Sequence, residues 1–311
     1  MLTAIIWGLA FVAQSEGLRN VGTYTFCTAR SWLAFITLAI TVLITDAVKK
    51  KKPKAEPVSY RKGDLLKGGI ACGLALFTAT IIQQNGIMLT SVGKSGFITA
   101  LYILFVPIFG LFLKKKVTPL LWVSVVIALT GMYFLCMSGN SELNKGDMYI
   151  LICAVLFSVH ILCVDRFANR VDGVKLSCFQ FGVCAVLSTI CMFIFEKPVM
   201  SDIINAAIPI VYAGVFSSGV AFTLQIVAQK DAPPTVTTLI MSLESVFAAL
   251  FGWLILEESL SAKELCGCAL VFAAIILCQL PIKKREKKSA ARAKDSTDDV
   301  TESENKMAEN Y

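Results

Sequence analysis

One carboxylate lies inside an apolar run, where a charged side chain is costly. Glu244 is near the middle of residues 233–258, a stretch that begins with two prolines and ends with a Glu-Glu pair. A charged side chain at the centre of a bilayer costs about 2.5–3.5 kcal/mol on insertion scales, so such residues usually face a protein interior or a water-filled cavity. Glu244 is therefore the first candidate for a functional residue.

Two interpretations of Glu244 are open. In the first, Glu244 binds a proton or a solute amine, and its protonation is coupled to transport. In the second, it pairs with Arg30 or His160 and fixes its helix. His160, the only histidine, lies in another apolar run and could relay protons; the alternative is a hydrogen-bonded core residue. Arg30 could hold an anionic group, and the alternative is snorkelling or pairing with a carboxylate.

The other candidates are uncharged. Gln83 and Gln225 occupy matching positions in an internal repeat, so their amides could meet and bind a carboxylate or an amine. The alternative is a hydrogen bond between helices, worth about 0.6 kcal/mol in membranes. With a further amide and two aromatic side chains that could line a cavity, the candidates for solute binding or coupling are Glu244, His160, Gln83, Gln225, Arg30, Tyr102, Gln180 and Trp7. No catalytic residue, metal site or cofactor is predicted.

The composition predicts an all-α integral membrane protein. Hydrophobic residues make up 56% of the 311 residues and charged residues 16%, and the mean hydropathy is +0.70; a soluble domain carries about 25% charged residues. The net charge of +7 does not indicate nucleic acid, because the Lys and Arg residues lie in short breaks between apolar runs. The expected partners are a small-molecule solute and the lipid bilayer, with proton coupling and a homodimer left open.

Ten apolar runs are predicted to cross the bilayer. The first is short, since at 1.5 Å per residue it reaches about 20 Å of a hydrocarbon core about 30 Å thick, and we expect that the sequence lacks a few residues at its start. No pattern typical of a removable signal peptide is present. The predicted spans are residues 2–15, 23–45, 65–89, 95–113, 119–137, 147–166, 176–195, 203–228, 235–256 and 262–282.

Basic residues lie mainly on one side of these spans. If the first break is outside, the outer breaks hold one basic residue each, and the inner breaks hold the clusters. Lys and Arg are enriched in cytoplasmic loops, so both termini are predicted in the cytoplasm and the protein in the cell membrane. Residues 46–63 are predicted to form a basic cytoplasmic linker, and residues 283–311 a disordered cytoplasmic tail.

The two halves of the chain resemble each other. One alignment without gaps pairs Tyr102 with Glu244, and another pairs Arg30 with Gln180. Because each copy would have five helices, an odd number, the copies must lie in opposite orientations across the bilayer. Inverted repeats of this kind occur in secondary transporters, with the solute site between the halves. The predicted repeats are residues 1–138 and 146–282.

Three motifs resemble those of one family. IWGLAF at residues 6–11, GFITALY at residues 96–102 and LESVFAA at residues 243–249 are similar to motifs of the EamA family of the drug/metabolite transporter superfamily. The resemblance covers residues 1–282 and implies ten helices in two inverted five-helix repeats that move small organic solutes, often by export of amino acids or other metabolites. The family usually has Glu-Pro where this chain has Glu244-Ser245, so the expected kink in this helix is lost.

The leading prediction is a secondary-active transporter, and an exporter, of small organic metabolites. Amino-acid-like solutes are the best single choice, moved by alternating access that is coupled to protons or driven by the solute gradient. No P-loop pattern indicates a built-in ATPase. The alternatives are a membrane receptor or scaffold and an intramembrane hydrolase. No enzyme activity is predicted, because Ser158 and His160 are two residues apart and point to different helix faces.

Overall fold

The computed structural model describes residues 1–51, 62–115, 117–136, 144–256 and 261–279, which form helices and contain no strand. The helices are α1 (Leu2–Gly17), α2 (Thr23–Lys51), α3 (Lys62–Ile87), α4 (Val92–Thr99), α5 (Tyr102–Phe112), α6 (Pro119–Cys136), α7 (Lys145–Ala168), α8 (Gly173–Phe195), α9 (Met200–Asn205), α10 (Ala207–Val211), the π-helix η1 (Tyr212–Ala221), α11 (Phe222–Ala228), α12 (Pro234–Met241), α13 (Leu243–Leu256) and α14 (Ala262–Gln279). The predicted linker therefore begins inside α2 and ends inside α3. The predicted tail lies outside the described residues.

Seven segments of the described chain are long and apolar enough to cross a membrane. They are Thr23–Val48, Gly63–Ile87, Val92–Phe112, Lys145–Ala168, Gly173–Phe195, Ala207–Ala228 and Pro234–Leu256, and two shorter apolar helices are Pro119–Phe134 and Leu265–Cys278. The first predicted span is the 16-residue helix α1. The all-helical fold is thus confirmed in the described residues, whereas the number of ten crossings stays a prediction.

Several helices begin with a side chain that caps their free N–H groups. The clearest case is α7, where Asn144 accepts a hydrogen bond from the Asp147 backbone at 2.9 Å and the Asp147 carboxylate accepts one from the Asn144 backbone at 2.9 Å. Asp147 also accepts a hydrogen bond from Thr90 at 2.8 Å and pairs with Lys94 at 2.6 Å. This carboxylate therefore fixes the start of α7 and joins it to α4.

Two of the apolar segments are broken in their middle. The segment of α4 and α5 is interrupted at Ala100 and Leu101, and the segment of α12 and α13 is interrupted at Ser242. In α5, Pro107 has no N–H to donate, and the turn before it contains a tighter bond from the Ile103 N–H to the Ala100 carbonyl at 3.0 Å. Both breaks occur at positions that the internal repeat matches.

The break at Ser242 corrects the expectation that this helix lacks a kink. Two serine hydroxyls act in place of the proline. Ser242 Oγ donates to the Leu239 carbonyl at 2.7 Å, and Ser245 Oγ donates to the Ser242 carbonyl at 2.7 Å. Hydroxyls that bond to carbonyls of the preceding turn compete with the helical hydrogen bonds and bend helices. The sequence prediction was wrong because it considered only proline.

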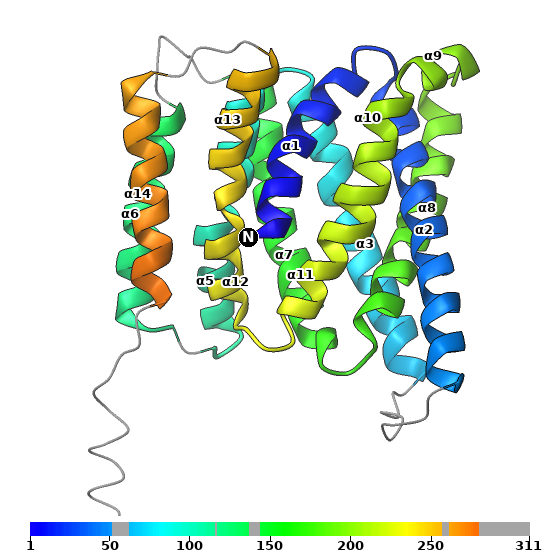
Figure 1. The fold of residues 1–311 in the computed structure, drawn as a ribbon, viewed down its shortest axis with the longest axis horizontal. Coiled ribbons are helices and arrows are strands. Elements are labelled where there is room, and N and C mark those ends of the chain that lie inside the picture. Colours follow the sequence, from blue (N-terminus) through cyan, green and yellow to red (C-terminus); the bar gives the residue numbers. More distant parts are fainter. Residues whose placement is uncertain (52–61, 116, 137–143, 257–260, 280–311) are drawn as a thin grey trace, which may run out of the picture. The chain divides into compact units, whose positions relative to one another are not determined.

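The two halves of the chain pack through α2 and α8, which lie side by side in Figure 1. At one end of this pair, Glu196 accepts hydrogen bonds from the Tyr24 and Thr25 backbones at 3.0 and 2.8 Å. At the other end, Asp46 pairs with Lys175 at 2.8 Å. A carboxylate at the end of each helix thus binds the start of the other, which fixes the two helices antiparallel.

Glycines allow two further close contacts between the halves. A Cβ atom on Gly73 of α3 would lie 2.6 Å from the Val183 Cβ of α8, and a Cβ atom on Gly214 of η1 would lie 2.7 Å from the Leu33 Cβ of α2. Both distances are shorter than real side chains tolerate. Only glycine at these positions lets the helix pairs approach this closely.

We predict that Gly73→Ala lowers the free energy of unfolding by about 1–3 kcal/mol, because the new methyl group overpacks the contact with α8. Thermal unfolding of the purified protein in detergent measures this loss. Gly63→Ala on the same helix is the matched control, since a Cβ atom there would have no neighbour within 4 Å, and it should leave stability equal or slightly higher. Equal melting temperatures for the two variants would contradict the close contact.

Candidate functional site

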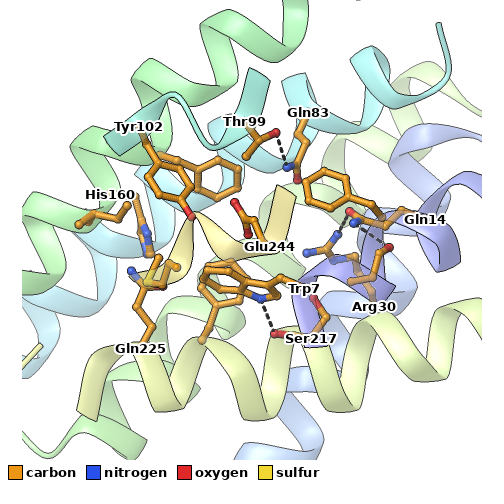
Figure 2. Close-up of a pocket in the computed structure, with 16 residues that line it drawn as sticks. Trp7, Gln14, Arg30, Gln83, Thr99, Tyr102, His160, Ser217, Gln225 and Glu244 are labelled. Carbon is orange, nitrogen blue, oxygen red and sulfur yellow. Dashed lines mark hydrogen bonds between the residues drawn. The ribbon is translucent and has the colours of Figure 1, made fainter. Parts of the chain in front are cut away.

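A cavity lies where the two helix breaks face each other, and side chains from both halves line it (Figure 2). Thr99 and Tyr102 flank one break, and Met241 and Glu244 flank the other. The full lining is Trp7, Ala10, Phe11, Gln14, Arg30, Gln83, Thr99, Tyr102, Phe157, His160, Ile161, Ser217, Phe222, Gln225, Met241 and Glu244. The cavity therefore contains seven of the eight residues predicted from the sequence.

The free space within this ring of side chains is small. The cavity holds about 40 Å³ of free volume, well below the roughly 300–1,000 Å³ of typical ligand pockets. A larger solute could enter only if side chains or helices move.

Glu244 lies in the first turn of α13, directly after the break, and only 2% of its surface is exposed. Its Oε1 atom has no hydrogen-bond partner, and no ion pair joins the carboxylate to Arg30 or His160 in the described part of the chain. The structural interpretation in which Glu244 pairs with one of these residues is therefore wrong for this conformation. The start of α13 offers partial compensation, because the N-terminus of a helix favours negative charge.

Tyr102 faces Glu244 across the cavity. Figure 2 shows the phenol directed toward the carboxylate, and the two groups are close enough to interact electrostatically. Tyr102 begins α5 as Glu244 lies at the start of α13, so the two residues that the internal repeat pairs stand at the two helix breaks. The Tyr102 hydroxyl has no hydrogen-bond partner among the described residues, so its O–H donor is available to a solute.

Arg30 lies on the other side of the cavity and is 3% exposed. Its Nη1 atom donates to Gln14 Oε1 at 2.8 Å and to Gln84 Oε1 at 3.4 Å. Pairing with a carboxylate, one of the sequence interpretations, is not found among the described residues. Snorkelling is not found either, because the guanidinium is buried inside the protein.

His160 is completely buried, and its Nε2 atom lies 3.1 Å from Gln180 Oε1. Its Nδ1 atom has no hydrogen-bond partner among the described residues. The ring packs edge-on against Phe157 and Phe222, with centroid distances of 6.5 and 5.9 Å. Gln180 does not line the cavity, so of the eight predicted residues it is the one that supports another instead of facing the site.

The amides of Gln83 and Gln225 both line the cavity but do not meet. Gln83 Nε2 donates to Thr99 Oγ1 at 3.3 Å, and Gln225 Nε2 donates to Gln229 Oε1 at 3.1 Å. The expected direct contact between the two amides is therefore wrong. The Gln225 Oε1 atom is buried without a partner, so this side chain retains an acceptor that faces the site.

Trp7 connects α1 to the π-helix η1. Its Nε1 atom donates to the Ser217 carbonyl at 3.3 Å, and its ring lies 4.7 Å from that of Phe222. A π-helix leaves gaps in the ordinary ladder of backbone bonds and is frequent at functional sites. The rings of Trp7, Phe157 and Phe222 thus form an aromatic wall of the cavity. Polar groups and the aliphatic residues Ala10, Ile161 and Met241 also line the cavity.

The sequence did not single out Gln14, Thr99 or Ser217 as cavity residues. Gln14 lies at the end of the first apolar run, where a polar residue is unremarkable. Ser217 contributes its backbone carbonyl, which no side-chain pattern reveals. One signal could have identified Gln14. It is a polar residue in the helix that directly precedes the helix of Arg30.

We predict opposite effects on stability for two changes of carboxylate to amide. Glu244→Gln should raise the free energy of unfolding by about 1 kcal/mol, because it removes a buried ionisable group that has no ionic partner. Asp147→Asn should lower it by about 3 kcal/mol, because it breaks a buried pair with Lys94. Thermal unfolding in detergent compares the two variants, and a destabilised Glu244→Gln variant would show that the carboxylate is structural.

Comparison with known proteins identifies the family. The chain matches the model of the EamA-like transporter family over residues 1–137 and 144–279. It is 28% identical to an uncharacterized transporter of Archaeoglobus fulgidus over 90% of this chain and 84% of that protein, and 21% identical to the uncharacterized transporter YoaV of Bacillus subtilis over 91% and 96%. A solved crystal structure has the same fold, with a TM-score of 0.70 and 19% identity over 89% of this chain and 94% of its own. The chain is thus a multi-pass membrane protein that belongs to the EamA-like transporter family.

Proposed function

We propose that the protein is a secondary-active exporter of small organic solutes, that the cavity is its solute site and that Glu244 couples transport to protons. The observation that carries the proposal is a buried carboxylate without an ionic partner, placed at a helix break between the two halves. Broken helices at the midplane commonly hold the solute and coupling ions of secondary transporters. A carboxylate there could bind either a proton or a solute amine.

Alternating access needs two halves that move against each other, and we propose residues 1–138 and 146–282 as inverted repeats for this role. The reciprocal contacts of α2 and α8 support the proposal: Glu196 binds Thr25, and Asp46 binds Lys175. The alignment that pairs Arg30 with Gln180 also pairs Thr25 with Lys175 and Asp46 with Glu196. The two contacts therefore occupy matching positions in the repeats. The distribution of Lys and Arg supports ten crossings, cytoplasmic termini and a location in the cell membrane.

Ion pairs at the two ends of one helix suit such a movement. Near its start, α7 is joined to α4 by Lys94 and Asp147, and near its end it is joined to the residues after α5 by Lys115 and Asp165. Opening the cavity on either side would separate one pair and keep the other. The broken α4–α5 segment could bend between these two attachments.

Amino-acid-like solutes remain the best single choice of substrate. The Glu244 carboxylate suits an ammonium group, and the rings of Trp7, Phe157 and Phe222 suit an apolar body. The intramembrane hydrolase is less well supported, because Ser158 Oγ donates to the Ala154 carbonyl at 2.8 Å and His160 bonds to Gln180. Solute flux distinguishes a transporter from a receptor or a scaffold, since neither of these two roles requires flux.

We predict that wild-type protein in liposomes accumulates a solute from a panel of amino acids and nucleosides when a pH gradient is imposed. Glu244→Gln should still exchange that solute between the two sides, but accumulation should fall at least tenfold, because the amide cannot carry a proton. Radiolabelled uptake with and without the gradient measures both properties.

The control for this experiment is Asp231→Asn, which removes an exposed carboxylate in the turn between α11 and α12 and should accumulate solute as the wild type does. Equal accumulation by Glu244→Gln would reject proton coupling through this residue. Absence of any flux with the wild type would reject solute transport itself.

A further inference from the structure

No carboxylate in the described part of the chain neutralises the positive charge of Arg30. The guanidinium is 3% exposed, and no carboxylate of the described residues lies within ion-pair distance of it. A buried charge is normally paired, because its desolvation is otherwise uncompensated. Arg30 is also the only Lys or Arg side chain among the residues that line the cavity.

The guanidinium still has donors to offer. Arginine carries five N–H donors in a planar fork, and both hydrogen bonds of Arg30 to described residues use Nη1. The Nε and Nη2 groups therefore make no hydrogen bond with any described side chain or carbonyl. Figure 2 shows Arg30 beside the cavity, across from Tyr102.

Gln14 explains how the guanidinium is held without being neutralised. Its Nε2 atom donates to the Ala10 carbonyl at 2.9 Å, which directs its Oε1 atom toward Arg30. A glutamate at this position would offer the same oxygen but would cancel the charge. A neutral amide fixes the orientation of the arginine and leaves its charge for another partner.

We propose that Arg30 is an anion-binding subsite for the carboxylate of a solute, and that Gln14 is the positioning residue that holds the guanidinium in place. A planar fork matches the two oxygens of a carboxylate. Because the cavity lining contains no second cation, a singly charged carboxylate fits better than a doubly charged phosphate. The subsite is confined to the first half, since the residue that the internal repeat pairs with Arg30 is the neutral Gln180.

The inference rests on the proposed role of the cavity as the solute site, but carboxylate binding is measured without transport. The probes are phenylacetate and phenylacetamide, which differ only in the anionic group and carry a ring for the aromatic wall. Thermal unfolding of the full chain in detergent is followed at constant ionic strength. At ten times its dissociation constant, phenylacetate should raise the melting temperature of the wild type by about 3 °C, and phenylacetamide should not.

Three variants complete the experiment. Arg30→Gln should lose the response to phenylacetate. Gln14→Glu should also lose it, and its melting temperature without a probe should be higher than that of the wild type because the new carboxylate pairs with Arg30; this gain separates lost binding from misfolding. Asn205→Asp is the control, a change of amide to carboxylate at an exposed position of α9 outside the cavity lining, and it should keep the response.

Equal shifts with the two probes, or a full phenylacetate response in Gln14→Glu, would overturn the subsite. The result is independent of flux. A wild type that responds to phenylacetate but moves no solute in liposomes would retain the anion subsite and reject the proposed transport. A wild type that moves solutes but responds equally to both probes would retain transport and reject the subsite.

Discussion

A charge that is removed from water must find compensation, and this requirement governs the centre of the protein. Two ionisable side chains, the carboxyl group of Glu244 and the guanidinium of Arg30, lie buried in a largely apolar interior without an ionic partner among the described residues. Each is held by weaker means: Glu244 by the start of α13 and the neighbouring phenol, and Arg30 by two amide oxygens. Such incomplete compensation costs stability in a folded protein, and it is the usual state of a site that awaits a charged ligand.

The broken helices make this arrangement possible. In a continuous helix every backbone group is already bonded, and a buried charge would meet only side chains. At the breaks after α4 and α12 the chain offers free helix ends inside the membrane region, and Tyr102 and Glu244 are placed there. The serine hydroxyls at Ser242 and Ser245 bond to the carbonyls of Leu239 and Ser242, so these carbonyls at the break between α12 and α13 have side-chain partners.

The sequence predicted the helical membrane fold and seven of the sixteen residues that line the cavity for a simple physical reason. A polar residue inside an apolar run is expensive, so Glu244, Arg30 and His160 were conspicuous before any geometry was known. The contacts between them were not predictable, because the direction of a side chain depends on how helices pack. The pairing of Glu244 with Arg30 or His160 and the meeting of the two repeat-related glutamines therefore failed. The kink at Ser242 was not predicted, because hydroxyl groups break helices only in a suitable context.

The π-helix η1 has a consequence for how the two halves keep their register. In the first turn of η1, Gly214 contacts α2 much as Gly73 contacts α8, and after η1, Gln225 lines the cavity as Gln83 does. The interval from Gly214 to Gln225 is one residue longer than the interval from Gly73 to Gln83. An extra residue in an ordinary helix would rotate all later side chains by about 100° around the axis. The wider turn of η1 takes up that residue. Gln225 thereby still points inward, so a length difference between the halves is absorbed locally and the cavity lining is preserved.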